Sequence, residues 1–445
     1  MKKNRVDEFI KYPKKSLIVL ATPILIGMLV QTLYNVVDTA FVGRLGSESI
    51  AALTFSFPLF FILISLTVGV GAGINSLIAR KLGEKNKVDA ENAAMHGLLI
   101  SLSLSLIVFL LGYFALNPIF RLFGAEGNVI TLGISYMSII LFGFFFMFPA
   151  FTLNGIFVAQ GNSKTAMQVQ ISGLILNIIL DPIFIYTFKL GVRGAAFATI
   201  ISFFFSLILY LYLLSSRSYL KIHPSSFRFS SDIIIQILKV GMPSTVMMLL
   251  MSLYSIFINR FMAHYGTDYV AALGISSRLE SVVVMPFVAF SLALLTIVGM
   301  FFGAKRLDLV KMVLYHSLKI GIVWTLVSGA VIFSFPKLFL LIFTNDQFLV
   351  EIGSAYLRIN VFLFPFLVFS LMISRALQGM GYGLPGLFIN LVRVIFISIP
   401  AAFIFVFILD YSYLSIALAT VLGAIISAIF ALILLNIEFR KSDIH

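Results

Sequence analysis

Long apolar stretches dominate the chain, and short polar segments separate them. Most stretches hold twenty or more residues, enough for a helix to cross the ~30 Å hydrocarbon core of a bilayer. The stretches are unbroken, whereas strands of a membrane barrel would show short alternating segments. The pattern predicts transmembrane helices over residues 16–40, 49–79, 93–116, 129–157, 163–188, 192–214, 232–259, 270–300, 313–334, 347–374, 386–409 and 412–437.

Composition agrees with this pattern. Apolar residues make up 60% of the 445 residues, charged residues only 11%, and the mean hydropathy is +1.09. The surface of a soluble protein of this length must be far more polar. We therefore expect an all-α polytopic membrane protein. The chain has no cysteine, which excludes disulfides and thiolate metal sites.

The positive charge follows the membrane topology. The formal net charge is +13. Lysines and arginines gather before the first span, between spans two and three, in the central linker, between spans eight and nine, and at the C-terminal end. By the positive-inside rule, both termini and the linker lie in the cytoplasm, and we expect a multi-pass protein of the plasma membrane. Since topology explains the charge, we expect the bilayer and no nucleic acid as a partner.

The chain contains an internal duplication. A shift of 220 residues places Pro23 on Pro243 and Gly46 on Gly266, and a shift of 218 places Pro182 on Pro400. The repeat predicts two pseudo-symmetric six-helix bundles around a central cleft, an arrangement suited to alternating access. We place the N-terminal bundle at residues 1–214, a hinge-tolerant cytoplasmic linker at 215–235, and the C-terminal bundle at 236–445. No phosphate-binding loop appears, so uphill transport would have to use an ion gradient.

The two halves differ at two acids. Asp38 falls on Ile258 and Asp181 falls on Ile399. An acid within a very apolar span is costly, and the repeat shows that the position can hold isoleucine. Chemistry, rather than packing, therefore explains both acids best. The alternatives are that Asp38 caps a helix end near Gly43 and that Asp181 belongs to an Asp-Pro turn.

Both acids lie on polar helix faces. In the first span the face consists of Gln31, Tyr34, Asn35 and Asp38, and in the fifth span it consists of Gln170, Asn177 and Asp181. We expect these faces to converge, with Tyr136 and Thr199 completing a cluster of oxygens. Two neighbouring carboxyl groups out of water readily share a proton, and the same oxygens suit Na⁺. Pro23 permits a kink in the first span.

Other residues allow more than one interpretation. Phe144, Phe145, Phe146 and Phe148, with Met28 and Asn154, could line an apolar cavity or pack in the core. Gly69, Gly71 and Gly73 indicate close helix packing, and duplication accounts for the pair His96 and His316. In the second half, the charged residues within spans are Arg278, Glu280, Arg358 and Arg393, for which we favour structural ion pairs over lining of the cleft.

Taken together, these residues resemble those of the multidrug and toxic compound extrusion (MATE) transporters, over essentially the whole length. The matching positions are Pro23, Asp38, Tyr136, Asn177, Asp181-Pro182, Thr199 and the Gln160-Gly161-Asn162 turn. The resemblance is to the archaeal and DinF-like branch and implies an antiporter driven by H⁺ or Na⁺. It implies a coupling site of Asp38, Asp181, Asn177, Thr199 and Tyr136, of which the first four could ligate Na⁺, and a first span that bends at Pro23.

The expected function is export of small amphipathic, often cationic compounds. We expect the substrate to contact Gln31, Tyr34, Asn35, Asn154 and Met28. We expect a monomer, no cofactor besides the coupling ion, and no enzyme activity, since no nucleophile–base pair stands out. The main alternative is a lipid or lipid-linked oligosaccharide flippase, for which Arg278, Arg358 and Arg393 would be relevant. A non-transporting receptor would leave the acids unexplained.

Overall fold

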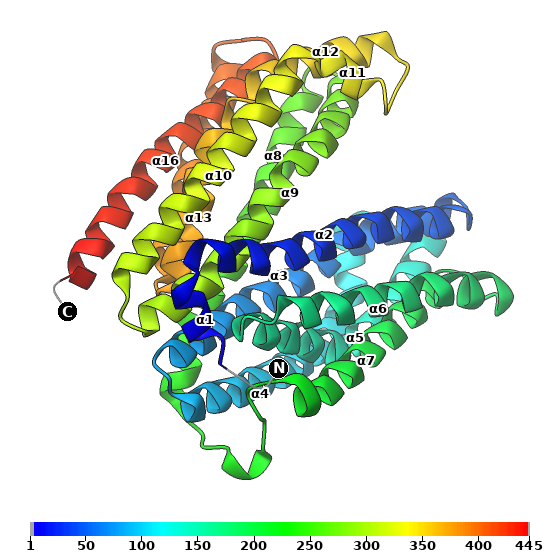
Figure 1. Cartoon of the computed structure of the whole chain (residues 1–445). Helices are drawn as coiled ribbons and strands as arrows, with labels where there is room; N and C mark the ends of the chain where they lie inside the picture. Colours follow the sequence, from blue (N-terminus) through cyan, green and yellow to red (C-terminus); the bar gives the residue numbers. More distant parts are fainter. Residues whose placement is uncertain (1–3, 444–445) are drawn as a thin grey trace. The chain divides into compact units, whose positions relative to one another are not determined.

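The chain folds into helices at every predicted span. The computed structural model describes residues 4–443, and for Asn35, Thr39, Pro224, Ser442 and Asp443 it describes the backbone but not the side chain. Eleven helices in this range are long and apolar enough to cross a membrane, and a bent helix pair accounts for the twelfth span (Figure 1). No strand occurs in the described range. The predicted all-α polytopic fold is confirmed.

The first repeat contains six spans centred on one helix. Its elements are α1 (Val6–Lys11), α2 (Pro13–Gly43), α3 (Ser47–Gly83), α4 (Lys87–Leu122), α5 (Gly127–Ala159), α6 (Ser163–Pro182), η1 (Ile183–Thr187) and α7 (Val192–Arg217). Helix α5 packs against α3, α4 and α7. A short 3₁₀ turn, η2 (Pro224–Ser226), follows in the linker.

The second repeat follows the same order. Its elements are α8 (Ser231–Ala263), α9 (Thr267–Gly303), α10 (Leu307–Ser334), α11 (Pro336–Leu340), α12 (Gln347–Asn360), α13 (Leu363–Gly379), α14 (Gly383–Leu391), η3 (Val392–Ser398), α15 (Ile399–Phe403), η4 (Ile404–Ile408) and α16 (Leu414–Asp443). Helix α13 packs against α9, α10 and α16, as its counterpart α5 does with α3, α4 and α7.

The tenth span is broken, which the continuous stretch 347–374 did not predict. Helices α12 and α13 form it, bent by 53°. The break lies at Val361 and Phe362, and Pro365 is four residues beyond Val361. Proline has no amide hydrogen for the carbonyl of residue i−4 and its ring clashes there. The Val361 carbonyl accepts instead from Phe364 N at 3.3 Å.

The backbone confirms the duplication at its turns. Lys85 and Lys305, which the shift of 220 pairs, both adopt a left-handed φ of 57°. Lys189 and Asp410, which are 221 residues apart, also form such a pair, with φ of 55° and 52°. Residues with a Cβ rarely adopt this conformation, so its recurrence at matched positions reflects a shared loop geometry.

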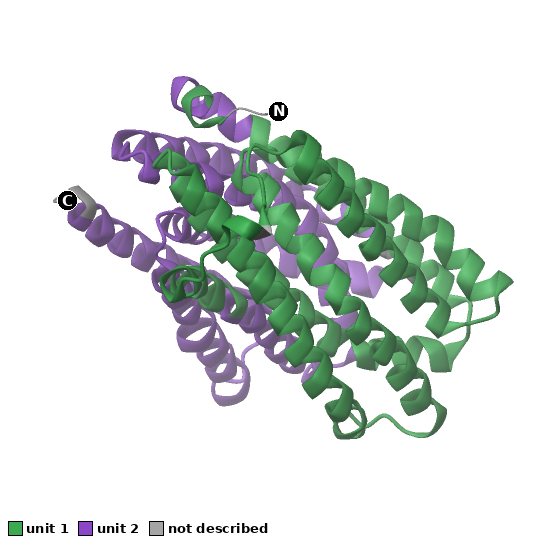
Figure 2. Cartoon of the chain, turned by 90° about the horizontal axis from the view of Figure 1, so that it is seen from below, with its two compact units in different colours: residues 1–8, 19–245 green, residues 9–18, 246–445 purple. Residues whose placement is uncertain are grey.

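Contacts divide the chain into two compact units (Figure 2). The first contains the residues up to Glu8 and Val19–Thr245; the second contains Phe9–Ile18 and everything from Val246 onward. The unit boundary therefore lies inside α8, ten residues beyond the predicted domain start at 236. The internal repeat did not predict that the first residues of α8 pack with the first unit.

Two glycines of α3 explain why the start of α8 belongs to the first unit. A Cβ on Gly73 would lie 2.2 Å from the Ile237 carbonyl oxygen, and one on Gly69 would lie 2.6 Å from the Thr245 nitrogen. Neither leaves room for a side chain, so the two backbones touch, as in small-residue packing of membrane helices. Nothing lies within 4 Å of a Cβ on Gly71. Close packing is thus confirmed for Gly69 and Gly73.

The linker is bound to the first unit, contrary to the expectation of a hinge-tolerant connector. Gln160 Oε1 accepts from Ser218 Oγ at 2.8 Å and from the backbone nitrogens of Tyr219 and Leu220. Glu91 accepts from Lys221 N at 2.7 Å. These side chains satisfy backbone donors that a free loop would leave to water, and so they fix the start of the linker.

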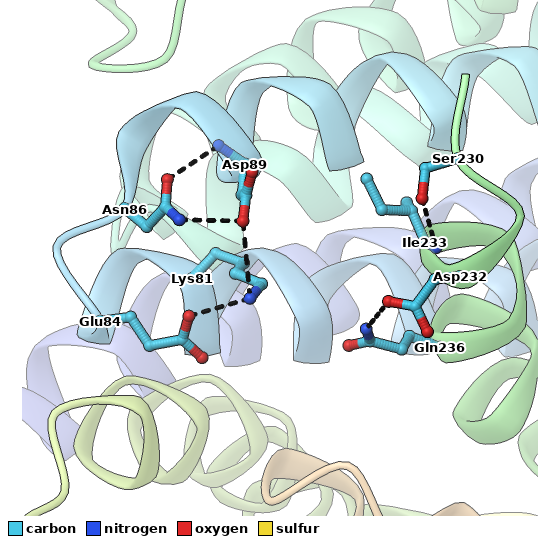
Figure 3. A network of polar contacts seen from close by, with 8 residues as sticks. All are labelled: Lys81, Glu84, Asn86, Asp89, Ser230, Asp232, Ile233 and Gln236. Atoms are coloured by element: carbon cyan, nitrogen blue, oxygen red, sulfur yellow. Dashed lines mark hydrogen bonds and ion pairs between the residues drawn. The ribbon is translucent and has the colours of Figure 1, made fainter. Parts of the chain in front are cut away.

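His96 fixes the end of the linker. Its Nδ1 lies 2.9 Å from the Asn92 carbonyl, and its Nε2 accepts from Ser230 N at 2.9 Å. This pattern matches the neutral imidazole with its proton on Nδ1. Ser230 then caps α8 by accepting from Ile233 N at 3.4 Å (Figure 3). Figure 3 also shows the turn between α3 and α4, where Lys81 pairs with Glu84 at 2.9 Å.

Candidate functional site

Asp181 forms the centre of the candidate site. Its side chain is 0% exposed, on α6 one residue before Pro182. Its Oδ1 accepts a hydrogen bond from Asn177 Nδ2 at 3.1 Å, one helical turn earlier. Its Oδ2 is buried and has no hydrogen-bond donor. A buried carboxylate oxygen without a donor is costly, so the site favours a proton or a cation there.

Asp38 of α2 meets Asp181. The two carboxyl groups lie close enough for a hydrogen bond between them. Two carboxylates can only accept, which accounts for the missing donor at Asp181 Oδ2, and a hydrogen bond between them requires one shared proton. The predicted convergence of the two acids is confirmed. Asp38 therefore contacts the fifth span, and Asp181 lies in a helix that continues beyond it rather than in a turn.

Two tyrosines and a threonine surround the acids. Tyr34 and Tyr136 both lie near Asp38 and Asp181. The Tyr34 hydroxyl lies within hydrogen-bonding reach of Thr199, whose own hydroxyl donates to the Ala195 carbonyl at 2.9 Å. Thr199 can therefore accept from Tyr34. Tyr136 lies near both acids, whereas Thr199 lies beside Tyr34 and bonds Ala195 of its own helix. Tyr34, expected to contact substrate, also belongs to the cluster.

Local helix geometry holds this arrangement. Pro182 lacks the amide hydrogen that would continue the α-helical pattern, and the chain passes into the π-helical turn η1 directly after it. From η1, Tyr186 donates to the Phe41 carbonyl of α2 at 2.5 Å. Ile185 and Val42 join the same buried apolar cluster. The segment after Asp181 thus anchors the end of the helix that carries Asp38.

The remaining predicted residues have varied surroundings. A Cβ on Gly27 would lie 2.9 Å from Gln170 Oε1, so α2 and the polar face of α6 pack closely. Gln31 and Met28 are half-buried on α2. Asn154 donates to the Tyr210 hydroxyl at 2.8 Å, a contact between α5 and α7. The side chain of Asn35 lies outside the described residues.

Phe144 and Phe148 pack in the core of the first unit. Both are fully buried, with ring centroids 5.2 Å apart. Core packing, one of the two interpretations of this aromatic stretch, is therefore the correct one for these two rings. Phe145 and Phe146 are half-buried. Pro23 is half-buried within α2, which continues through it as one helix from Pro13 to Gly43.

The second unit repeats the two tyrosines and the threonine that surround the acids, but not the acid pair. We call these three residues the frame of the site. Tyr254, Tyr356 and Thr420 correspond to Tyr34, Tyr136 and Thr199 at shifts of 220, 220 and 221. Tyr254 lies within hydrogen-bonding reach of Thr420, as Tyr34 does of Thr199. Ile258 and Ile399, which replace the acids, lie together in one apolar cluster with these tyrosines. Isoleucine therefore fills the space that carboxyl groups fill in the first unit.

A different carboxylate joins this second frame. Asn360 donates to Glu280 Oε1 at 2.6 Å and accepts from Thr420 at 2.8 Å. Glu280 comes from the eighth span and Asn360 from the end of α12 at the break. Because these positions do not match those of the first-unit acids, the repeat comparison gave no signal for this network. Among the described residues, Glu280 forms no ion pair, so the expected structural ion pair is wrong for it.

The geometry defines a polytopic membrane protein with two related helical units and an intramembrane acid pair in only one of them. The sequence model of the MatE family matches residues 23–183 and 243–404, so the chain belongs to the MATE family of transporters. The two matched segments are the two repeats, including both acids in the first.

Known relatives are similar over most of the chain. The probable multidrug resistance protein YoeA of Bacillus subtilis is 29% identical over 407 residues, covering 88% of this chain and 86% of YoeA. The multidrug export protein MepA of Staphylococcus aureus is 27% identical over 393 residues, covering 87% and 84%. A solved outward-facing structure of a multidrug resistance MATE transporter superposes with a TM-score of 0.92 at 31% identity, covering 97% of each chain.

Proposed function

We propose that this transporter exports small amphipathic, often cationic compounds from the cell in exchange for H⁺ or Na⁺. Two similar proteins are named for multidrug resistance and multidrug export, which supports the drug-efflux part of the proposal. The names of these relatives give the lipid-flippase alternative no support. The ion-coupled part depends on the site itself.

The meeting of Asp38 and Asp181 carries the coupling proposal. When both groups are ionised, two negative charges face each other out of water, and Asp181 Oδ2 has no donor. One proton between them, or one Na⁺, removes this repulsion. For Na⁺, Asn177 has its carbonyl oxygen available because its Nδ2 faces Asp181, and Thr199 offers a hydroxyl oxygen. Cation binding therefore changes the charge of the site by one.

A change in charge can be linked to a change in conformation. A ligand shifts a two-state equilibrium only by the difference in its affinity for the two states. The acids link α2 to α6, so loading and unloading of the cation strengthens and weakens this link. Pro23 lies fifteen residues before Asp38 in α2 and leaves one backbone carbonyl without its helical partner. We propose that α2 bends at Pro23 when the cation binds.

The test is transport by purified protein in vesicles with pH and Na⁺ gradients imposed separately. We expect efflux of a cationic dye to follow one of the two gradients and to stop when that gradient is collapsed. Asp38→Asn should abolish the gradient-driven component. The matched control is Asp268→Asn, which removes an exposed carboxylate at the start of α9 and should transport normally. Undiminished gradient-driven efflux by Asp38→Asn would overturn the coupling proposal.

The proposed location is the plasma membrane with both termini in the cytoplasm. The chain has no cysteine, so single cysteines can be introduced without background. We expect a membrane-impermeant maleimide to label Asn345→Cys, between α11 and α12, in intact cells. Ser225→Cys in the linker should react only after permeabilisation. The reverse pattern would contradict the proposed orientation.

A further inference from the structure

Two arginines of the second unit replace apolar residues of the first. Arg375 lies in α13 and Arg393 in η3. With the shift of 218, their counterparts are Phe157 (375 − 218) and Ile175 (393 − 218). Arg393 lies within the predicted span 386–409, whereas Arg375 directly follows the predicted span 347–374, near the end of α13. Charge within a membrane span is costly and usually serves a substrate or ion path. At both positions the second repeat therefore carries a positive charge where the first repeat carries an apolar side chain.

Neutral groups surround the guanidinium of Arg393. It donates to Asn390 Oδ1 at 3.2 Å and to Met251 Sδ at 2.8 Å. An amide oxygen accepts a hydrogen bond but does not compensate a full charge, and a thioether is a weak acceptor. The side chain is half-buried, so its charge is only partly hydrated.

Arg375 has the same kind of surroundings. It donates to Gln378 Oε1 at 2.9 Å, and its Nε is buried without a hydrogen-bond partner. Gln378 in turn donates to Met247 Sδ at 3.4 Å. Met247 and Met251 are four residues apart on α8 and therefore on one helix face. Arg393 therefore bonds this face directly through Met251, whereas Arg375 is connected to it through Gln378 and Met247.

No carboxylate compensates the two arginines within the described range. The ion pairs there involve other residues, near helix ends and in loops. Glu280, the acid within a span of this unit, accepts from Asn360 instead. Two partly buried guanidinium groups thus have donors to spare, Arg393 in contact with α8 and Arg375 one side chain away from it. Guanidinium binds a carboxylate or phosphate with paired hydrogen bonds.

We propose that Arg375 and Arg393 bind the anionic group of the transported compound. The inference rests on the proposed export function and narrows its substrate class: the preferred substrates are amphipathic zwitterions, which carry a carboxylate besides their cationic group. A purely cationic compound has no anionic group for the two arginines to bind, so its affinity should not depend on them. The shared chemistry also fits an anionic phospholipid headgroup, which the experiment separates.

The experiment compares rhodamine 110, a zwitterion with a free carboxylate, with rhodamine 123, its cationic methyl ester. Initial efflux rates are measured over a range of dye concentrations in phosphatidylcholine vesicles containing the full chain. We expect Arg393→Gln and Arg375→Gln each to raise KM for rhodamine 110 about tenfold while changing KM for rhodamine 123 less than twofold, because a hydrogen bond to a charged group is lost. Arg393→Lys, which keeps the charge, should recover part of the loss.

Controls separate the possible failures. Arg440→Gln removes an exposed arginine in the last turn of α16, in the same unit, and should transport both dyes like the unchanged protein. An equal loss for both dyes, or transport of rhodamine 123 without rhodamine 110 by the unchanged protein, overturns the anion site and leaves export intact. Failure to transport either dye contradicts the proposed function itself. The measurements are repeated with phosphatidylglycerol in the vesicles. A variant effect that appears only there, and for both dyes, assigns the arginines to a lipid and overturns the proposal.

Discussion

Asp181→Asn tests whether the acid pair works as a charge switch. The substitution keeps the size of the side chain and replaces one of its two carboxyl oxygens with an amide nitrogen. That nitrogen can take the place of Oδ2, the oxygen that has no donor. The new Nδ2 can donate to Asp38, which the ionised pair cannot do. A hydrogen bond to a charged group contributes about 1.5–3 kcal/mol. The variant should therefore resemble the cation-loaded protein even without a cation.

The size of this effect follows from the same contact. A bias of about 1–3 kcal/mol shifts a two-state equilibrium roughly 5–150-fold toward one state. The variant should lose gradient-driven efflux while its folded state remains at least as stable as that of the unchanged protein. Its other hydrogen bond, from Asn177, is kept because Asn accepts through its remaining carbonyl oxygen.

Two measurements check the reasoning together. Thermal unfolding in detergent should give an apparent Tm equal to or above that of the unchanged protein, with less dependence on pH and Na⁺. Efflux in vesicles should no longer follow either gradient. A clear fall in Tm would mean that the carboxylate stabilises the fold through contacts that the structure does not contain. Normal coupling would mean that Asp181 is not the switch.

Three further predictions concern the surroundings of the site and the fold. Tyr34→Phe removes the hydrogen bond to Thr199 and should weaken cation affinity without unfolding, by about 0.5–1.5 kcal/mol, measured as a shift in the ion concentration for half-maximal efflux. Gln160→Ala leaves linker backbone donors unpaired at a cost of about 1–3 kcal/mol and should speed proteolysis of the linker, whereas Gln168→Ala on the exposed face of α6 should not. Gly73→Ala should lower the yield of folded protein because its Cβ would clash with the Ile237 carbonyl, while Gly71→Ala, which has open space, should be tolerated.

The spans and the acid pair could be predicted because they follow simple periodicities. Apolar length gave every span, since few other folds need so much continuous hydrocarbon. Asp38 and Asp181 were found because the repeat has isoleucine at both positions, and their helical spacing placed them on inward faces. The structure brings them together as expected.

The features that were missed depend on contacts between distant positions. Asn360 reaches Glu280 only because α12 ends there, at a break that Pro365 causes four residues beyond Val361. The hydrogen bonds that hold the linker join Gln160 to residues 58 to 60 positions later, and no local pattern indicates such a partner. The role of Tyr34 was assigned to substrate because its helical face does not reveal that Thr199 is its partner.

The two repeats show how one frame can serve two purposes. Both units keep a tyrosine within hydrogen-bonding reach of a threonine and a second tyrosine nearby, so this frame belongs to the shared fold. The first unit fills it with two acids, and the second fills the same positions with Ile258 and Ile399 in an apolar cluster. The isoleucine pair itself has no charge that a cation could change, and the carboxylate beside this second frame, Glu280, comes from a position without a counterpart among the first-unit acids. In the proposed mechanism the acid pair of the first unit takes up the cation, whereas the isoleucines at the matching places of the second unit do not, and this difference lets an ion favour one conformation over another.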